Sequence, residues 1–117
     1  METIREAVAV DLIKRELSSD KFLRKTNKAD SEIYVVNAHN SPNIMIEIGR
    51  LRELSFRTAG GGTGKSIDID EYDTMENPFE QLIVWDPKAE KILGGYRFLL
   101  GKDVRFTGKM NFGTEPY

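Results

Sequence analysis

The sequence contains no cysteine and a single histidine, and these absences remove several kinds of chemistry. Without cysteine the chain has no disulfides, no thiolate nucleophiles and no cysteine-ligated zinc sites, and it fits a reducing compartment. The lone histidine, His39, lies where a predicted strand gives way to a turn. A histidine in such a place usually has a turn or capping role, so we assign it no catalytic role.

Long apolar runs and charge of one sign are also absent. The N-terminal residues METIREAVAVDLIKREL carry charges throughout, which indicates neither a secretion signal nor a membrane span. The 17 basic and 19 acidic residues nearly balance and form no long block, so we expect no nucleic-acid partner. A chain of 117 residues can form one modest core, and we expect one cytoplasmic domain over residues 1–117.

The chain does contain a pattern of helices followed by strands. Apolar residues at helical spacing predict helices over residues 3–17 and 42–58, the second with Pro42 in its first turn after a Ser or Asn cap. The polar stretches 18–32 and 63–80 are predicted to be mostly turn and loop.

Three apolar runs have the composition of strands. Residues 33–38 are β-branched and aromatic, and residues 81–85 and 91–100 form an antiparallel hairpin across the turn DPKAE. Residues 101–117 are punctuated by glycine and show no recognisable closing element. The order of elements predicts the α+β class, with N-terminal helices packed on a mainly antiparallel sheet.

The stretch AGGGTGKS, residues 59–66, satisfies a relaxed phosphate-loop pattern. Such a loop needs a strand before the glycines and a helix after them, because the free N–H groups of that helix hold the phosphates. Here a helical pattern precedes the glycines, and the carboxylates that follow would repel a triphosphate. We interpret the stretch as a helix stop followed by a mobile loop, with a nucleotide site as a minor alternative.

A set of charged residues surrounds this loop. Arg52 and Phe56 lie one helical turn apart and share a face of the second predicted helix. The run DIDEYD supplies Asp68, Asp70 and Asp73, but it lacks the glycine that a calcium loop requires. A surface arginine beside a core aromatic and a solvated acidic loop are the simpler interpretations of these two groups.

Arg97 lies within the apolar strand GGYRFLL. An arginine in a buried strand must pair with a carboxylate or reach solvent, because an unpaired buried charge is costly. The acidic run is the obvious partner, so we expect Arg52, Asp73 and Arg97 to converge beside the central sheet.

The segments RLRELSF, DIDEYD and QLIVWDPKAEKILGGYRFLLG together resemble the GNAT-type N-acyltransferases over about residues 33–101. The resemblance is to the acyl-homoserine-lactone synthase branch, and more closely to the hemolysin-like N-acyltransferases related to enzymes of ornithine-lipid and other acyl-amino-acid lipid synthesis. The matching residues are Arg52, Phe56, Asp68, Asp70, Tyr72, Asp73, Gly94 and Arg97. Glycines replace the tryptophan that the lactone synthases carry after the helix, and Asp68 replaces the usual glutamate, so lactone synthesis is not implied.

The resemblance implies acyl transfer from a thioester, on acyl carrier protein or coenzyme A, to the amine of an amino-acid-like acceptor, with no tightly bound cofactor. It implies that Asp68 is the catalytic base, whose weak basicity rises if neighbouring carboxylates or desolvation raise its pKa. The residues implied to bind substrate or to hold the loop to the sheet are Arg52, Phe56, Asp70, Asp73 and Arg97.

The donor-binding unit of the family is not recognisable in the sequence, so we expect an incomplete form of the three-layer GNAT-like fold that is inactive alone. A lipid product implies peripheral membrane contact, and an exposed final strand could pair with a second copy to form a homodimer. The alternative is a non-catalytic module of the same fold, whose basic helix face of Arg50, Arg52 and Arg57 docks an acidic carrier protein.

Overall fold

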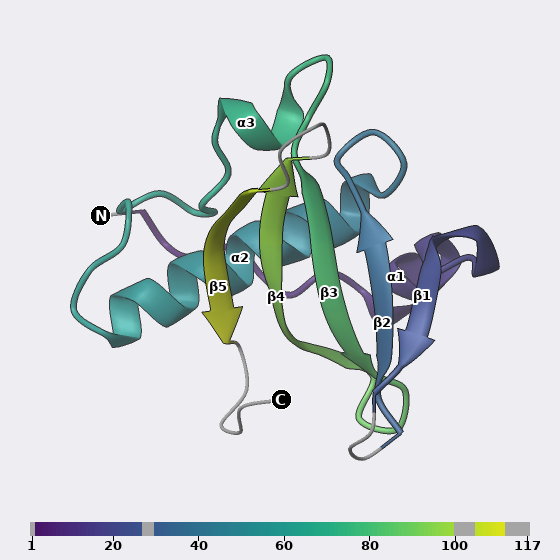
Figure 1. Ribbon diagram of the computed structural model, residues 1–117. Coiled ribbons are helices and arrows are strands. Elements are labelled where there is room, and N and C mark those ends of the chain that lie inside the picture. Colours follow the sequence, from purple (N-terminus) through teal and green to yellow (C-terminus); the bar gives the residue numbers. More distant parts are fainter. Residues whose placement is uncertain (1, 27–29, 100–104, 112–117) are drawn as a thin grey trace.

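The computed structural model describes residues 2–26 and 30–99, together with the backbone of residues 105–111 (Figure 1). The elements in chain order are α1 (Val10–Glu16), the 3-10 helix η1 (Ser19–Lys21), β1 (Phe22–Lys25), β2 (Glu32–Val36), α2 (Pro42–Thr58), α3 (Glu71–Thr74), β3 (Glu80–Asp86), β4 (Lys91–Leu99) and β5 (Arg105–Asn111).

The strands form one five-stranded sheet in the order β1-β2-β3-β4-β5, and every neighbouring pair is antiparallel. The predicted antiparallel sheet and the predicted β3–β4 hairpin are therefore confirmed. In that hairpin Gln81 lies opposite Arg97 and Ile83 lies opposite Gly95. Because residues opposite each other share a face of the sheet, Gln81 and Arg97 point to the same side.

Two strands were not predicted, and in each case the sequence shows no clear strand pattern. β1 is four residues long and exposed throughout, so no burial alternation marks it in the sequence. β5 falls in the glycine-punctuated region 101–117, where the prediction of no element is wrong. Because β5 pairs along β4, the edge of β4 is covered, and the described sheet has its free edges at β1 and β5.

The helix α2 begins and ends as predicted, although its N-terminus is capped in an unexpected way. Ser41 is the N-cap residue, but its hydroxyl donates to Asn40 Oδ1 at 2.8 Å instead of capping the helix. The carboxylate of Glu16, at the end of α1, accepts from Asn43 N at 3.0 Å and Ile44 N at 2.8 Å. A carboxylate from another element thus satisfies the free N–H groups and interacts favourably with the helix dipole.

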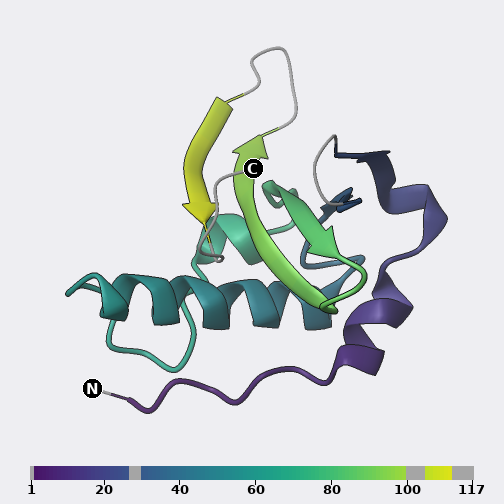
Figure 2. The same cartoon turned by 90° about the horizontal axis from the view of Figure 1, so that it is seen from below.

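The first predicted helix is shorter than expected, because residues 2–9 form neither helix nor strand. Their backbone donors bond elsewhere: Glu2 N donates to Gly64 O at 2.7 Å, and Val8 N donates to Glu47 Oε1 at 3.0 Å. In Figure 2 this N-terminal segment runs along the side of α2 that faces away from the sheet. Tertiary hydrogen bonds therefore override the helical spacing of the apolar residues.

The core lies between α2 and one face of the sheet (Figure 2). Its buried members come from the N-terminal region, α2 and β2 to β4: Val8, Ile13, Tyr34, Val36, Ile44, Met45, Ile48, Ile83, Trp85 and Ile92. In Figure 1 no helix of the described chain crosses the opposite face, so helices cover one face in this part of the molecule. Within the described residues, no helix is both long and apolar enough for a membrane span.

Candidate functional site

The acidic run DIDEYD leads into the short helix α3, where the sequence predicted mostly loop. Asp70 is the N-cap of α3, and its Oδ1 accepts from Tyr72 N at 3.0 Å and from Asp73 N at 3.3 Å. In return, Asp73 Oδ2 accepts from Asp70 N at 3.0 Å, which completes a capping box. These reciprocal bonds fix the direction of both carboxylates.

Asp73 is fully buried and is surrounded by donors from three elements. Arg52 of α2 donates from Nη1 to Asp73 Oδ2 at 2.9 Å, and Gln81 of β3 donates from Nε2 to Asp73 Oδ1 at 2.9 Å. Arg52 Nη2 also donates to Gln81 Oε1 at 2.8 Å. Each of these three residues is 3% exposed or less, so charge-assisted hydrogen bonds supply the compensation that a buried charge requires.

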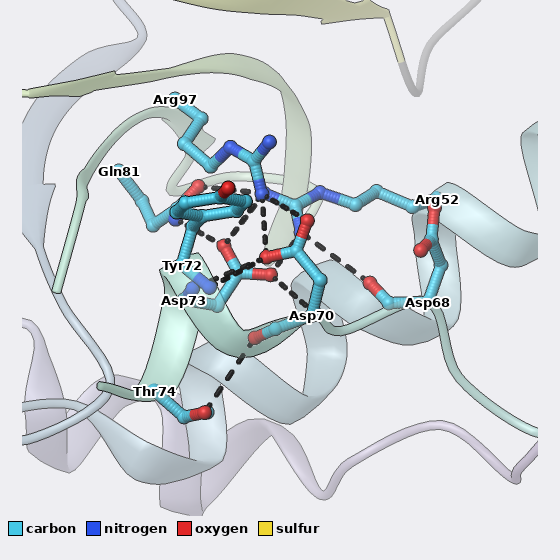
Figure 3. A network of polar contacts seen from close by, with 8 residues as sticks. All are labelled: Arg52, Asp68, Asp70, Tyr72, Asp73, Thr74, Gln81 and Arg97. Carbon is cyan, nitrogen blue, oxygen red and sulfur yellow. Dashed lines mark hydrogen bonds and ion pairs between the residues drawn. The ribbon is translucent and has the colours of Figure 1, made fainter.

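Arg97 of β4 joins this group from the sheet (Figure 3). Its Nη1 donates to both carboxylate oxygens of Asp70, at 2.8 and 2.7 Å, and lies 3.5 Å from Asp73 Oδ1. The guanidinium also lies 5.4 Å from the ring centroid of Phe79 and 5.8 Å from that of Tyr72, within the range of cation–π attraction. Partial burial lowers the pKa of Arg97, but the hydrogen bonds and charges of Asp70 and Asp73 outweigh it and raise that pKa.

The predicted convergence of Arg52, Asp73 and Arg97 is therefore confirmed. We call Arg52, Asp70, Asp73, Gln81 and Arg97 the network. Desolvation raises the pKa of Asp70, yet the hydrogen bonds and charge of Arg97 hold it below its ordinary value. The two arginines and two aspartates balance in charge, and the interpretation of Asp73 as part of a solvated loop is wrong.

Gln81 is the member of the network that the sequence analysis missed. It opens the apolar run QLIVW and is 2% exposed. Its position opposite Arg97 places it on the face covered by α2, where a buried amide needs partners. Gln81 alternates along the strand with the inward-facing Ile83 and Trp85, and this alternation in the sequence would have indicated its inward orientation.

Asp68 lies beside the network but is not part of it. Its backbone N–H donates to Gly49 O at 2.9 Å, and its carbonyl oxygen accepts from Arg52 Nη1 at 3.3 Å. Its carboxylate accepts no hydrogen bond from the described part of the chain (Figure 3). Desolvation raises the pKa of Asp68 above its ordinary value, and Glu53, Asp70 and Asp73 add to this effect while Arg52 opposes it.

Two other residues from the sequence analysis lie outside the network. Phe56, one turn after Arg52 on α2, is half-buried and forms no part of these polar contacts. His39 lies in the turn before α2, as predicted, and its Nε2 is 2.8 Å from Met75 O. This contact joins the β2–α2 turn to the segment after α3.

The arginines of the basic helix face that the alternative interpretation required are paired with carboxylates. Arg52 is buried in the network, and the other two arginines are paired with glutamates of the same helix. Arg50 Nη2 lies 2.6 Å from Glu47 Oε2, and Arg57 Nε lies 2.7 Å from Glu53 Oε2. With Arg52 buried and the other two charges paired on α2, this face has less free positive charge than the alternative interpretation supposed.

The phosphate-loop-like stretch follows a helix, as predicted, and leads into the four-residue α3. The predicted helix stop is confirmed, and the strand–loop–helix context of a nucleotide site is missing from this part of the chain. The loop is also less free than predicted, because Thr63 N and Gly64 N donate to the Glu53 carboxylate. Over the described residues, no group of three or more histidine or carboxylate side chains could hold a metal ion.

A helix packed on an antiparallel meander, with an acidic segment tied to α2 by Arg52 and to β4 by Arg97, is the arrangement that the resemblance to the acyltransferases implied. Comparison with known families agrees: the model of the acetyltransferase (GNAT) domain matches residues 51–115, which is more than half of the chain. The chain belongs to the GNAT family.

Two curated proteins are similar to almost the whole chain. A glycine N(alpha)-acyltransferase of Bacteroides thetaiotaomicron is 63% identical over 106 residues, which cover 91% of this chain and 32% of that protein. A glycine N(alpha)-acyltransferase of Phocaeicola vulgatus is 62% identical over the same shares of the two chains. The chain thus spans about a third of the length of these relatives. No solved structure matches it.

Proposed function

We propose that the complete gene product is an N-acyltransferase that moves an acyl group from an acyl thioester to the amine of glycine. The relatives support this proposal, because both are named glycine N(alpha)-acyltransferase and both are more than 60% identical over 91% of the chain. Membership of the GNAT family supports the reaction class independently. We further propose that the product enters acyl-amino-acid lipid synthesis.

The structural observation that carries the mechanism is the unpartnered carboxylate of Asp68. Glycine is mostly an ammonium ion at neutral pH, and only the free amine attacks a thioester. A carboxylate whose pKa is raised by desolvation is a better proton acceptor than an ordinary aspartate, and no described side chain occupies its oxygens. Asp68 is therefore the base that we assign to the reaction.

The ammonium group of glycine first loses one proton to solvent. The free nitrogen then attacks the carbonyl carbon of the thioester, while Asp68 accepts a second proton from this nitrogen, directly or through water. The new carbon–nitrogen bond forms as the carbon–sulfur bond breaks, and the sulfur leaves as a thiol after taking up a proton. The proton held by Asp68 supplies that uptake, which returns Asp68 to its carboxylate form, so the overall reaction releases one proton to solvent.

Burial divides the other candidate residues into two groups. Arg52 and Asp73 are 3% and 0% exposed and are bonded to each other, which suits positioning residues. The side chain of Arg97 is 20% exposed and that of Asp70 is 45% exposed, so these two have surface that a small acceptor can reach. We assign the glycine carboxylate to Arg97, and Phe56 to packing against the acyl chain or acceptor.

We propose that the donor is acyl carrier protein or coenzyme A carrying the acyl group, bound as a co-substrate and not as a permanent cofactor. A cytoplasmic enzyme with peripheral membrane contact suits a water-soluble acceptor and an amphipathic acyl-glycine product. Polypeptide outside the described residues would complete the three-layer fold on the face opposite α2. A homodimer through a sheet edge would pair β1 or β5 with a second copy, since β5 covers the edge of β4.

The test is incubation of the complete gene product with labelled glycine and a long-chain acyl donor, in parallel with alanine and ornithine as acceptors. The proposal predicts labelled N-acylglycine that depends on enzyme and donor, with glycine preferred over the other amines. Running acyl carrier protein and coenzyme A thioesters separately identifies the donor. Folded enzyme that forms no N-acylglycine from either donor contradicts the proposed function.

A further inference from the structure

The glycine-rich loop 60–66 wraps around a carboxylate of the chain itself. Glu53, on the last turns of α2, is 0% exposed and receives four hydrogen bonds. Thr63 donates to Oε1 from its backbone N at 2.9 Å and its hydroxyl at 2.7 Å. Gly64 N at 3.0 Å and Arg57 Nε at 2.7 Å donate to Oε2. The pKa of Glu53 falls to about 2, first because of the Thr63 hydroxyl bond, which outweighs desolvation.

The glycines in this loop have different physical tasks. Gly60 has φ +93° and its missing side chain would meet no atom within 4 Å, so only its backbone conformation calls for glycine. Gly62 has φ +105°, and a Cβ there would also lie 2.8 Å from Glu53 Oε2 and 3.0 Å from Arg57 Cγ. The loop can therefore close over the carboxylate only because residue 62 has no side chain.

The segment that carries Asp68 leaves this loop and packs against the same helix. A Cβ on Gly49, one helical turn before Glu53, would lie 2.6 Å from Ile69 Cγ1 and 3.3 Å from Ile67 Cβ. The Asp68 N–H donates to Gly49 O at 2.9 Å between these two isoleucines. Asp68 is thus held in register at one point of α2, while the loop before it is held at the next turn.

We infer that residues 62–64 of this loop form a carboxylate-binding cradle whose ligand is Glu53, and that the closed cradle fixes the position of the Asp68 carboxyl group. Glu53 and Gly62 are then positioning residues. The same geometry explains why a phosphate-loop-like sequence occurs without a nucleotide site: its N–H donors bind an anion, and the chain supplies that anion itself. This inference rests on the proposed function only where it calls Asp68 the base.

The pKa of Asp68 reports its position, because it depends on burial and on the charged groups around it. Desolvation and the charges of Glu53, Asp70 and Asp73 raise the pKa of Asp68, and Arg52 lowers it. If the cradle opens and the segment moves toward solvent, desolvation weakens and the pKa of Asp68 falls toward its ordinary value. A variant that opens the cradle without removing a charge is needed, because loss of Glu53 would itself lower that pKa.

Gly62→Ala and Gly60→Ala form such a pair, since both place alanine at a positive φ but only residue 62 contacts Glu53. The Asp68 carboxyl group is titrated by carbon-detected NMR in the purified protein and both variants. We expect a downward shift of the Asp68 pKa in Gly62→Ala and a wild-type value in Gly60→Ala. Equal Asp68 titration in all three folded proteins would overturn the positioning role, whether or not the protein shows acyl transfer.

The ligand class of the cradle has its own test. Glu53→Ala leaves the donors of Thr63, Gly64 and Arg57 around a space that formate can enter. We expect formate to raise the melting temperature of Glu53→Ala in a saturable manner, with no such effect of equal sodium chloride and none on the wild type. Failure of formate to stabilise the folded variant contradicts the cradle. If Glu53→Ala does not fold, the glycine pair still decides the inference.

A kinetic measurement connects the cradle to catalysis and keeps the two proposals distinguishable. We expect Gly62→Ala to lower kcat for N-acylglycine formation while the KM for glycine stays unchanged, and Gly60→Ala to leave both unchanged. If the wild-type enzyme forms no N-acylglycine, the proposed function fails, and the NMR and formate results still support or overturn the cradle.

Discussion

Asp68 and Asp73 lie five positions apart beside the same arginine, yet their surroundings are opposite. Asp73 is fully buried and receives hydrogen bonds from Arg52, Gln81, Arg97 and the backbone of Asp70. Asp68 is half-buried, and its carboxylate receives none from the described residues. Arg52 serves both, since it pairs with the carboxylate of one and with the backbone carbonyl of the other.

This difference in hydrogen bonding separates a structural carboxylate, Asp73, from a carboxylate that can accept a proton, Asp68. A carboxylate with saturated oxygens and paired charge stabilises a fold and has little tendency to accept a proton. A carboxylate left without partners in a partly dehydrated place destabilises its own charged form and accepts a proton more readily. The network thus acts as the scaffold, and Asp68 is the group that the scaffold presents.

The largest effect on stability is expected from Arg52→Ala, because this change leaves the Asp73 carboxylate buried without its main counter-charge. Removing one partner of a buried pair costs about 3–5 kcal/mol. Urea unfolding of the purified protein measures this loss. If the stranded charge is the cause, the double variant Arg52→Ala, Asp73→Asn recovers part of it. A loss well under 1 kcal/mol in Arg52→Ala would mean that the network does not hold the fold.

A smaller effect is expected from Arg97→Ala, which removes the more exposed arginine of the network. Its contact with the half-exposed Asp70 and its cation–π contacts together contribute about 1–2 kcal/mol, because water screens the exposed pair. Urea unfolding should therefore rank Arg52→Ala clearly below Arg97→Ala in stability. The reverse ranking would contradict the division of the network into a buried part, Arg52 and Asp73, and a more exposed part, Arg97 and Asp70.

A third effect depends on acid, and it concerns the carboxylate of Glu53. The pKa of Glu53 is about 2 in the fold against an ordinary value of 4.5, so its contribution is complete above pH 4.5. That contribution is lost as pH falls from 4.5 toward 2. Melting curves should show Glu53→Gln below wild type at pH 6, with the gap closing as pH decreases. A gap independent of pH would show that the charge of Glu53 is not what the cradle binds.

Sequence periodicity predicted the parts of the fold in which burial follows a regular pattern. The helix α2 and the strands β2, β3 and β4 lie where alternation or helical spacing placed them. Residues 3–9 were assigned wrongly, because their backbone donors bond to a distant segment that no local pattern in the sequence reports. The strands β1 and β5 were missed for another reason: β1 is exposed along its whole length, and the sequence of β5 is interrupted by glycine.

The candidate site was predicted in part. The charges of Arg52, Asp73 and Arg97 require compensation in a buried setting, and this requirement was enough to bring them together. The roles of Gln81 and Glu53 were not foreseen, although each is a polar residue on an otherwise buried face. The sequence alone does not predict that such a polar side chain is buried, because its hydrogen-bond partners come from other segments of the chain.

The most direct test of the account compares Asp68→Asn with wild type in both acyl transfer and thermal stability. We predict that kcat/KM for N-acylglycine formation falls about 10²–10⁴-fold, the usual worth of a general base. Because the raised pKa means that the Asp68 charge opposes folding at neutral pH, the melting temperature should stay equal or rise. Full activity in a folded Asp68→Asn variant would contradict the central claim.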